Sequence, residues 1–582
     1  MLDLRLYRVT LLPFALVFVI AAFSLHARGA TLQSNPAQTI DGAAALHEAA
    51  GWANQYPDAT AGSPADAALA EHLEPELAPC RRDQAGCSVQ IVDSGVETTS
   101  GERTVRTVVA SRAGAGPAVA LIASRGPGTG NLLATALLVK LAGLYRNLAP
   151  GHPLTLVSTS GGPSAMGAVA AMLPAGTEAA IVVGDVAGSI GDRPYVVPWS
   201  ASGALAPIQL RSAVAAALSS ALARPVGDPS FADQLARLAL PVTTGAQGLL
   251  GGAGIPAELV GLGGEGPPPR PAAAQATVAG DFGQALLEIT AALDQGPALE
   301  TAPTRDLAVG SQVLGGWAAR TVVAALLLSL LACGLDVLAR ARRRRAPVLR
   351  WSLWALSCSL PFALTGLFAA FLGAGGLLPA TPAAAVTPAL MAVSAAGAAA
   401  LVSAVLVLIL GWVLHAAVTA RTACAGPPEP VGAAAALILT GTAVATLVWL
   451  ANPYAAALIA LPLHLWLIVA TREQPRRPAV GALCVAISLA PFAAALGVVC
   501  VALGTEPFGL LWTLLLLVAG GGMSAWGVVL ASLFAGTFAA AATLLVRGGA
   551  AAPAQRLDVT MRGPLSYAGP GSLGGTPSAL RR

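Results

Sequence analysis

The sequence predicts a chain of two parts, an α/β domain with a mostly parallel sheet and a bundle of transmembrane helices. Residues 28–315 carry mixed charge and alternate short β-type runs with helical patterns, which is typical of an α/β domain. From Trp317 onward, long apolar runs follow one another. The whole chain has 55% hydrophobic and 11% charged residues, whereas a soluble protein has about 25% charged residues.

The first apolar run, Val9 to Leu25, follows Arg5 and Arg8. Residues 1–27 are therefore either a cleaved signal peptide or a signal anchor. The stretch "SLHARGA" offers only a weak small-residue cleavage site, and a run of this length is just long enough to span a bilayer. We expect an uncleaved anchor, and either alternative sends the following segment across the membrane.

The domain of residues 28–315 is predicted from ten segments that alternate along the chain. The strands are expected at Val89–Val92, Thr104–Ala110, Ala118–Ala123, Leu154–Ser158 and Ala180–Val183, and the helices at Ala65–Leu77, Leu132–Leu148, Ala165–Leu173, Ala206–Ala223 and Phe282–Leu293.

Residues 316–547 are predicted to hold seven further spans, at 317–339, 351–372, 388–415, 431–450, 454–470, 479–503 and 523–546. Arginines occur in every second connection, in "RARRRR" (340–345), at Arg421, in "REQPRR" (472–477) and at Arg547. This alternation follows the positive-inside rule. It places residues 28–315 outside the cytoplasm and both termini inside, with residues 548–582 as a disordered cytoplasmic tail. Residues 508–520 are too short for a comfortable span and are expected to be re-entrant or to lie along the surface, although two true crossings are the alternative.

Two cysteines fall in the outer domain, Cys80 and Cys87, in "CRRDQAGC". In an oxidising compartment they are expected to form a disulfide, and two free thiols are the alternative. The formal net charge of +4 is too small for this length to indicate nucleic-acid binding, and there is no basic-aromatic strip. The lipid bilayer is the partner that the composition predicts.

The order of the segments resembles that of the di-zinc aminopeptidases. "DATAGSPADAALAEHL" (58–73) resembles the entry motif of that family, and residues 104–145 resemble its two strands, metal loop and long helix. "LTLVSTSGGPSAMGA" is similar to its next strand and Glu-Glu loop, and "AAIVVGDVAGS" (179–189) to the strand that ends in a metal-binding Asp. The resemblance covers about residues 40–295 and implies an aminopeptidase-like fold.

The residues at the family's site positions do not fit its chemistry. Ser124 stands where the resemblance implies the first His ligand, and Asn131 falls on or next to the bridging Asp. Gly161 and Gly162 replace the Glu pair, which supplies the general base and a ligand, and only Asp185 matches its ligand position. A two-metal hydrolase needs several carboxylate and imidazole ligands and a base. We therefore expect no zinc, no other cofactor and no catalytic residue.

An aminopeptidase-like domain without metal ligands, between one anchor helix and seven more spans, resembles the Gaa-type subunit of the GPI-anchor transamidase, a non-catalytic membrane scaffold. The sequence has no Asn-x-Ser/Thr sequon and fits a bacterial source. The resemblance therefore implies the architecture of the Gaa-type subunit but not a role in GPI anchoring. The favoured function is a pseudo-peptidase that binds a partner subunit, a polypeptide or a lipid-linked group. The alternatives are a transporter with an accessory outer domain and an atypical active zinc-dependent aminopeptidase.

Overall fold

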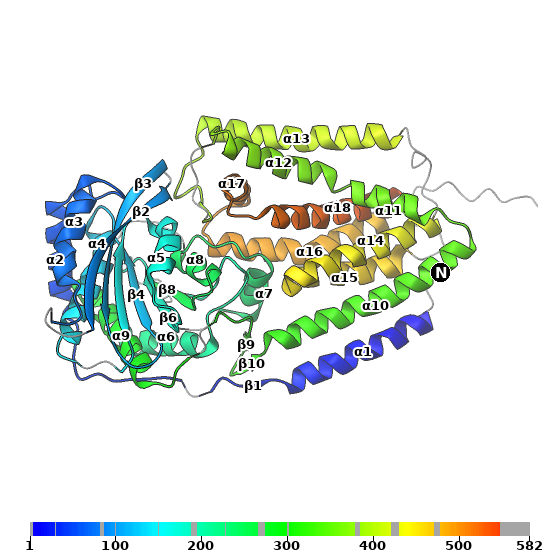
Figure 1. The fold of residues 1–582 in the computed structure, drawn as a ribbon. Coiled ribbons are helices and arrows are strands. Elements are labelled where there is room, and N and C mark those ends of the chain that lie inside the picture. Colours follow the sequence, from blue (N-terminus) through cyan, green and yellow to red (C-terminus); the bar gives the residue numbers. More distant parts are fainter. Residues whose placement is uncertain are drawn as a thin grey trace, which may run out of the picture.

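The computed structural model describes residues 4–29, 31–81, 86–98, 101–148, 151–187, 195–226, 229–265, 274–299, 302–378, 384–420, 430–470 and 478–547. An α/β domain lies at one end of an elongated bundle of helices (Figure 1). The domain is built from the residues between helix α1 (Leu4–Phe23) and helix α10 (Gly316–Arg343). The predicted tail of residues 548–582, Arg421 and the stretch 472–477 lie outside the described residues.

A seven-stranded mixed sheet forms the centre of the α/β domain, in the order β2-β3-β5-β4-β6-β8-β7. The strand pairs β5-β4, β4-β6 and β6-β8 are parallel, whereas β2-β3, β3-β5 and β7-β8 are antiparallel. The expectation of a mostly parallel sheet therefore holds only for the central strands. The strands are β2 (Cys87–Thr98), β3 (Gly101–Arg112), β4 (Val119–Ser124), β5 (Leu154–Thr159), β6 (Ala179–Val183), β7 (Tyr195–Val197) and β8 (Ala257–Gly261).

Apolar side chains cover both faces of the central strands. On β4, Val119, Leu121 and Ala123 belong to one buried cluster, while Ala120 and Ile122 belong to the buried cluster on the opposite face. A strand buried on both sides reads as a continuous apolar run, and this is why the run Ala118–Ala123 was recognisable. The first face is covered by α2 (Gly42–Gln55), α3 (Pro64–Glu76), α4 (Thr129–Tyr145), α6 (Ile208–Ala221) and α9 (Ala276–Gln295), and the second by α5 (Met166–Met172), α7 (Phe231–Ala239) and α8 (Ala246–Gly252).

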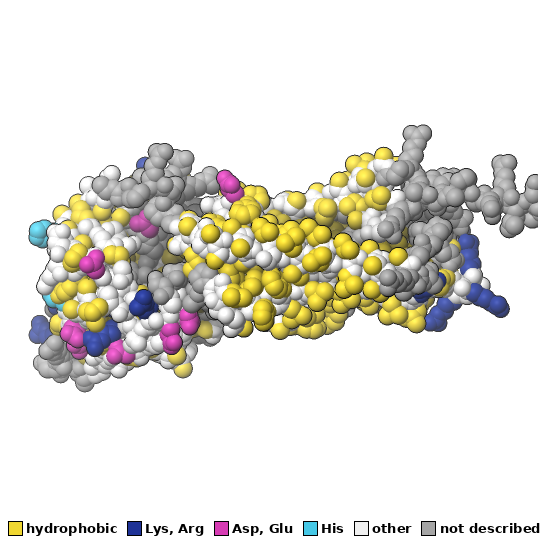
Figure 2. Space-filling model, turned by 90° about the horizontal axis from the view of Figure 1, so that it is seen from above, with side chains coloured by type: hydrophobic (Ala, Val, Ile, Leu, Met, Phe, Trp, Pro, Cys, Tyr) yellow, Lys and Arg dark blue, Asp and Glu magenta, His cyan; other side chains and the backbone are white. Residues whose placement is uncertain are grey.

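Eight helical segments of the described chain are long and apolar enough to cross a membrane, with α11 and α12 counted together as one segment. Figure 2 shows a continuous hydrophobic surface over the helices, with basic side chains at the end away from the α/β domain. The predicted spans are therefore present as helices. Besides α1 and α10, the bundle contains α11 (Val348–Ser357), α12 (Leu360–Ala374), α13 (Ala395–Ala420), α14 (Pro430–Ala451), α15 (Pro453–Ala470), α16 (Pro478–Ala502) and α18 (Ala525–Arg547).

The short helix α17 (Pro507–Ala519) lies across the direction of the long helices, at the end of the bundle that adjoins the α/β domain (Figure 1). Its Trp512 is fully buried and donates its indole N–H to the carbonyl of Met391, at 3.2 Å. A β-carbon on Gly373 of α12 would lie 2.1 Å from the carbonyl oxygen of Ala519, so that only glycine permits this close packing. With 13 residues, α17 is shorter than the eight helical segments that could cross a membrane.

Helix α1 packs into the bundle through polar contacts. The Tyr7 hydroxyl lies 3.2 Å from Nδ1 of His464 on α15, and the Ser329 hydroxyl on α10 donates to the carbonyl of Thr10 at 2.8 Å. Such hydrogen bonds join helices within an apolar environment, where water cannot compete. These contacts join α1 to α10 and α15.

The α/β domain is seated directly on the helices. Helix α7 packs on α15 and α16, and the amide of Asn452, between α14 and α15, donates to the carbonyl of Leu238 at 2.7 Å. The Tyr454 hydroxyl donates to the carbonyl of Arg305 at 2.6 Å. A small antiparallel sheet of β1 (His26–Ala27), β10 (Gln312–Leu314) and β9 (Leu307–Val309) joins the segments next to α1 and α10.

Candidate functional site at the carboxyl edge of the sheet

The predicted site positions meet at the carboxyl edge of the parallel strands. Ser124 is the last residue of β4 and is paired in register with Thr159 of β5. Gly161 and Gly162 follow β5, and Asp185 follows β6. Asn131 lies in the first turn of α4, the helix that leaves β4. Loops at this edge of an open α/β sheet are where such folds bind ligands, and the structure brings the five positions to this edge.

The two glycines shape an open loop. Gly161 has a φ of 88° and Gly162 a φ of 57°, a left-handed conformation that other residues adopt only at a cost. A β-carbon on Gly162 would meet no other atom within 4 Å. The short 3-10 helix Gly162–Ala165 begins directly after Gly161. The loop therefore keeps a tight strand-to-helix turn while offering neither a carboxylate nor bulk at its tip.

The polar residues at this edge mainly hold the backbone. Asn131 donates its side-chain amide to the carbonyl of Pro127, at 2.7 Å, and so closes the loop before α4. Asp185 accepts the N–H of Ala187 with Oδ1, at 2.8 Å, while its Oδ2 has no hydrogen-bond partner among the described residues. The half-buried Ser124 lies beside them. None of these contacts supplies a base or a ligand set.

A buried ion pair, which the sequence reasoning missed, lies directly behind this edge. Arg125 donates through Nε to Oδ1 of Asp66, at 2.7 Å, and the two side chains are 0% and 1% exposed. The Ser160 hydroxyl donates to Oδ2 of Asp66 at 2.5 Å, and the Nη1 atom of Arg125 donates to the carbonyl of Ser158 at 2.7 Å. Burial lowers the pKa of Arg125, which Asp66 opposes; an arginine stays charged at any ordinary pH.

This ion pair fixes the site loops to the scaffold. Asp66 lies in the first turn of α3, and its backbone N–H donates to the hydroxyl oxygen of Ser63, the N-cap residue, at 3.0 Å. Arg125 follows the last residue of β4, and Ser160 precedes Gly161. The sequence feature that could have indicated this ion pair is that Asp66 and Arg125 are charged residues, each among apolar or small neighbours. The two residues are 59 positions apart, so no local pattern could have paired them.

The residues present do not fit a zinc centre. Among the described parts of the chain, no group of three His, Cys, Asp or Glu side chains could hold a metal ion. His72 pairs with Glu76 on its own helix, 3.5 Å away. His152 lies 2.8 Å from the buried Glu178, which immediately precedes β6 and therefore lies at the amino edge of the sheet. Asp185 belongs to no such group among the described residues, and one carboxylate by itself cannot supply the four ligands that zinc takes.

A second buried cluster ties the sheet to the helices that face the membrane bundle. Glu265, after β8, accepts hydrogen bonds from Arg237 of α7 and from the Thr243 hydroxyl. Gln247 of α8 donates to the same carboxylate at 3.2 Å, and Arg237 stacks over the ring of Trp199 at 5.3 Å. Because α7 packs on α15 and α16, this cluster lies between the sheet and the bundle.

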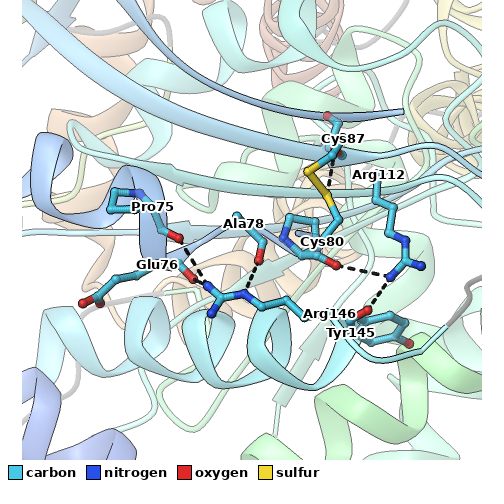
Figure 3. Close-up of a disulfide and its surroundings, with 10 residues drawn as sticks. Pro75, Glu76, Ala78, Cys80, Cys87, Arg112, Tyr145 and Arg146 are labelled. Carbon is cyan, nitrogen blue, oxygen red and sulfur yellow. Dashed lines mark hydrogen bonds between the residues drawn. A yellow bond between two sulfur atoms is a disulfide. The ribbon is translucent and has the colours of Figure 1, made fainter. Parts of the chain in front are cut away.

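Cys80 and Cys87 are bonded as a disulfide (Figure 3), and Cys87 pairs through Arg112 with the amino end of β5. Two arginines hold the chain around it. Arg146 donates to the carbonyls of Ala78, at 2.8 Å, and Glu76, at 2.7 Å, and Arg112 donates to the carbonyl of Tyr145. These contacts tie the segment after α3 to the end of α4, and they lie away from the carboxyl edge. The disulfide therefore has a structural place in the fold.

Comparisons with known proteins give a likeness for the α/β half alone. No family model matches the chain, and no curated protein matches it. A glutaminyl cyclase from an Acidobacteriales bacterium is similar at 16% identity, over 45% of this chain and 99% of that one, with a TM-score of 0.34. A Zn-dependent exopeptidase from Parabacteroides distasonis is also similar, at 12% identity over 44% of this chain and 99% of that one, with a TM-score of 0.34. LapB from Legionella pneumophila is similar at 12% identity over 47% of this chain and 79% of that one, with a TM-score of 0.36.

Proposed function

We propose that this protein is a membrane-embedded pseudo-peptidase, a non-catalytic subunit whose α/β domain binds a partner subunit, a polypeptide or a lipid-linked group. The observation that carries the proposal is the composition of the carboxyl edge. Ser124, Asn131, Gly161, Gly162 and Asp185 meet there without a ligand set or a general base. The proposal also draws on the resemblance of the segment order in the sequence to the Gaa-type subunit, a non-catalytic membrane scaffold.

The open loop supports binding at this edge. Gly162 has free space around it, whereas the ion pair behind it, Asp66 with Arg125, is fully buried and holds the strand ends in place. A rigid edge with a tip of glycines offers backbone groups and room to an extended chain or a lipid-linked group. Such a surface loses little conformational entropy when it binds, because the scaffold is already fixed.

The proposed orientation places the α/β domain outside the cytoplasm and both termini inside. Arg340 to Arg345 lie at the end of the bundle away from the domain, as the basic side chains in Figure 2 show, and basic residues favour the cytoplasmic side. A reporter fused after residue 345 should be active in the cytoplasm, and one fused after residue 200 should be active outside. The opposite pattern would overturn the orientation.

The Gly162→Trp variant tests binding at the loop. The indole would project into the open space at the tip, and we expect recovery of co-purifying partners to fall by roughly tenfold, as for a blocked binding centre. Full-length protein purified in mild detergent, followed by mass spectrometry, measures this. Gly162→Ala is the matched control because it shares the backbone strain at a φ of 57° but adds little bulk. Equal recovery by the Trp variant and the wild type would place the binding surface elsewhere.

A further inference from the structure

Arg320 occupies an unusual place at the end of the bundle that adjoins the α/β domain. It lies four residues after the first residue of α10, roughly 6 Å along the helix axis from that end. Its guanidinium lies over the ring of Trp449 on α14, with the carbon 4.8 Å from the ring centre. The Trp449 indole N–H donates to the carbonyl of Arg320 at 3.0 Å. Two helices therefore hold this cation in place.

No carboxylate of the described chain forms an ion pair with Arg320; the pairs that the other arginines make lie elsewhere, such as Arg340 with Asp336. Asp306, an acidic residue at this end of α10, uses Oδ1 to accept the N–H of Gly316 at 2.8 Å. A cation within a span is costly unless it meets an anion or the headgroup layer. An anionic lipid headgroup in the adjoining leaflet would supply such an anion.

Aromatic and basic residues lie near the start of α10, as a headgroup layer favours. Trp317 is 56% exposed on the same helix, and the Tyr454 hydroxyl donates to the carbonyl of Arg305 at 2.6 Å. A β-carbon on Gly316 would lie 2.9 Å from Cβ of Arg305, which places a second basic residue about one helical turn from Arg320. Trp and Tyr gather at the level of lipid headgroups.

We propose that Arg320, seated on Trp449, binds the phosphate of an anionic phospholipid in the leaflet next to the α/β domain, with Arg305 as a second basic residue. The planar guanidinium matches two phosphate oxygens. The ring of Trp449 covers one face of the guanidinium and leaves its edge for the lipid. The proposal is independent of what the carboxyl edge of the sheet binds.

Native mass spectrometry of delipidated full-length protein, titrated with dioleoylphosphatidylglycerol, tests this site. We expect Arg320→Gln to weaken binding of the first lipid about fivefold, the usual effect of one basic residue near an anionic surface. Arg106→Gln is the matched control, because Arg106 lies on the outer domain and pairs with Glu71; it should bind like the wild type. Millimolar inorganic phosphate should not displace the lipid.

Two further variants keep the test decisive if Arg320→Gln does not fold. Trp449→Leu removes the aromatic ring but keeps the positive charge of Arg320. Arg320→Lys keeps a positive charge but lacks the planar guanidinium. Both variants should weaken lipid binding by less than Arg320→Gln does. Unchanged lipid binding in Arg320→Gln, or in both of these variants, would overturn the proposal. Displacement by free phosphate would also overturn it, because the site would then take a soluble anion instead of a lipid.

Discussion

Replacement of Arg125 by Met is expected to destabilise the α/β domain by about 3–5 kcal/mol, the usual effect of breaking a buried ion pair. Arg125 is 0% exposed, so its loss leaves the Asp66 carboxylate buried with only the Ser160 hydroxyl as a side-chain donor. The carbonyl of Ser158, 2.7 Å from Nη1 of Arg125, loses its donor as well. Pulse proteolysis of the full-length protein across a urea titration would measure the free energy of unfolding.

Two further variants distinguish the destabilisation caused by an unpaired buried charge from that caused by any substitution of an arginine. The double variant Asp66→Leu with Arg125→Met removes both charges and should recover a large part of the loss, because no unpaired ion is left. Arg106→Gln breaks pairs with Glu71 and Asp93 whose side chains are 34–64% exposed. It should cost no more than about 1 kcal/mol. An Arg125→Met variant as stable as Arg106→Gln would contradict the role given to this ion pair.

The central strands could be predicted because each is a short apolar run buried on both faces. Leu154–Ser158 and Ala180–Val183 lie within β5 and β6 as expected. The direction of the outer strands could not be predicted, since periodicity carries no information on pairing. Strands β2 and β3 form an antiparallel hairpin with 12 residues in each strand, of which the sequence predicted only Val89–Val92 and Thr104–Ala110. β8 escaped notice because its five residues include Glu258.

At the carboxyl edge, the sequence predicted the positions but not what supports them. Ser124, Gly161 and Asp185 were placed by chain order, since each follows a recognisable strand. The Asp66–Arg125 pair joins α3 to the end of β4, and Glu265 joins Arg237 across 28 positions. Such contacts exist only once the fold has formed. In the bundle, the positions of the helices followed from hydropathy, whereas the contact between Tyr7 and His464 depends on how α1 packs.

Release of amino acids from aminoacyl reporter substrates, measured on the full-length protein with added zinc, tests the central claim most directly. The claim is that the edge formed by Ser124, Asn131, Gly161, Gly162 and Asp185 cannot activate water. Among the described residues, no group of three His, Cys, Asp or Glu side chains could hold a metal ion, and zinc hydrolases take three protein ligands and a water. We expect substoichiometric zinc and no hydrolysis above the blank. Stoichiometric zinc together with hydrolysis that a chelator abolishes would contradict the account.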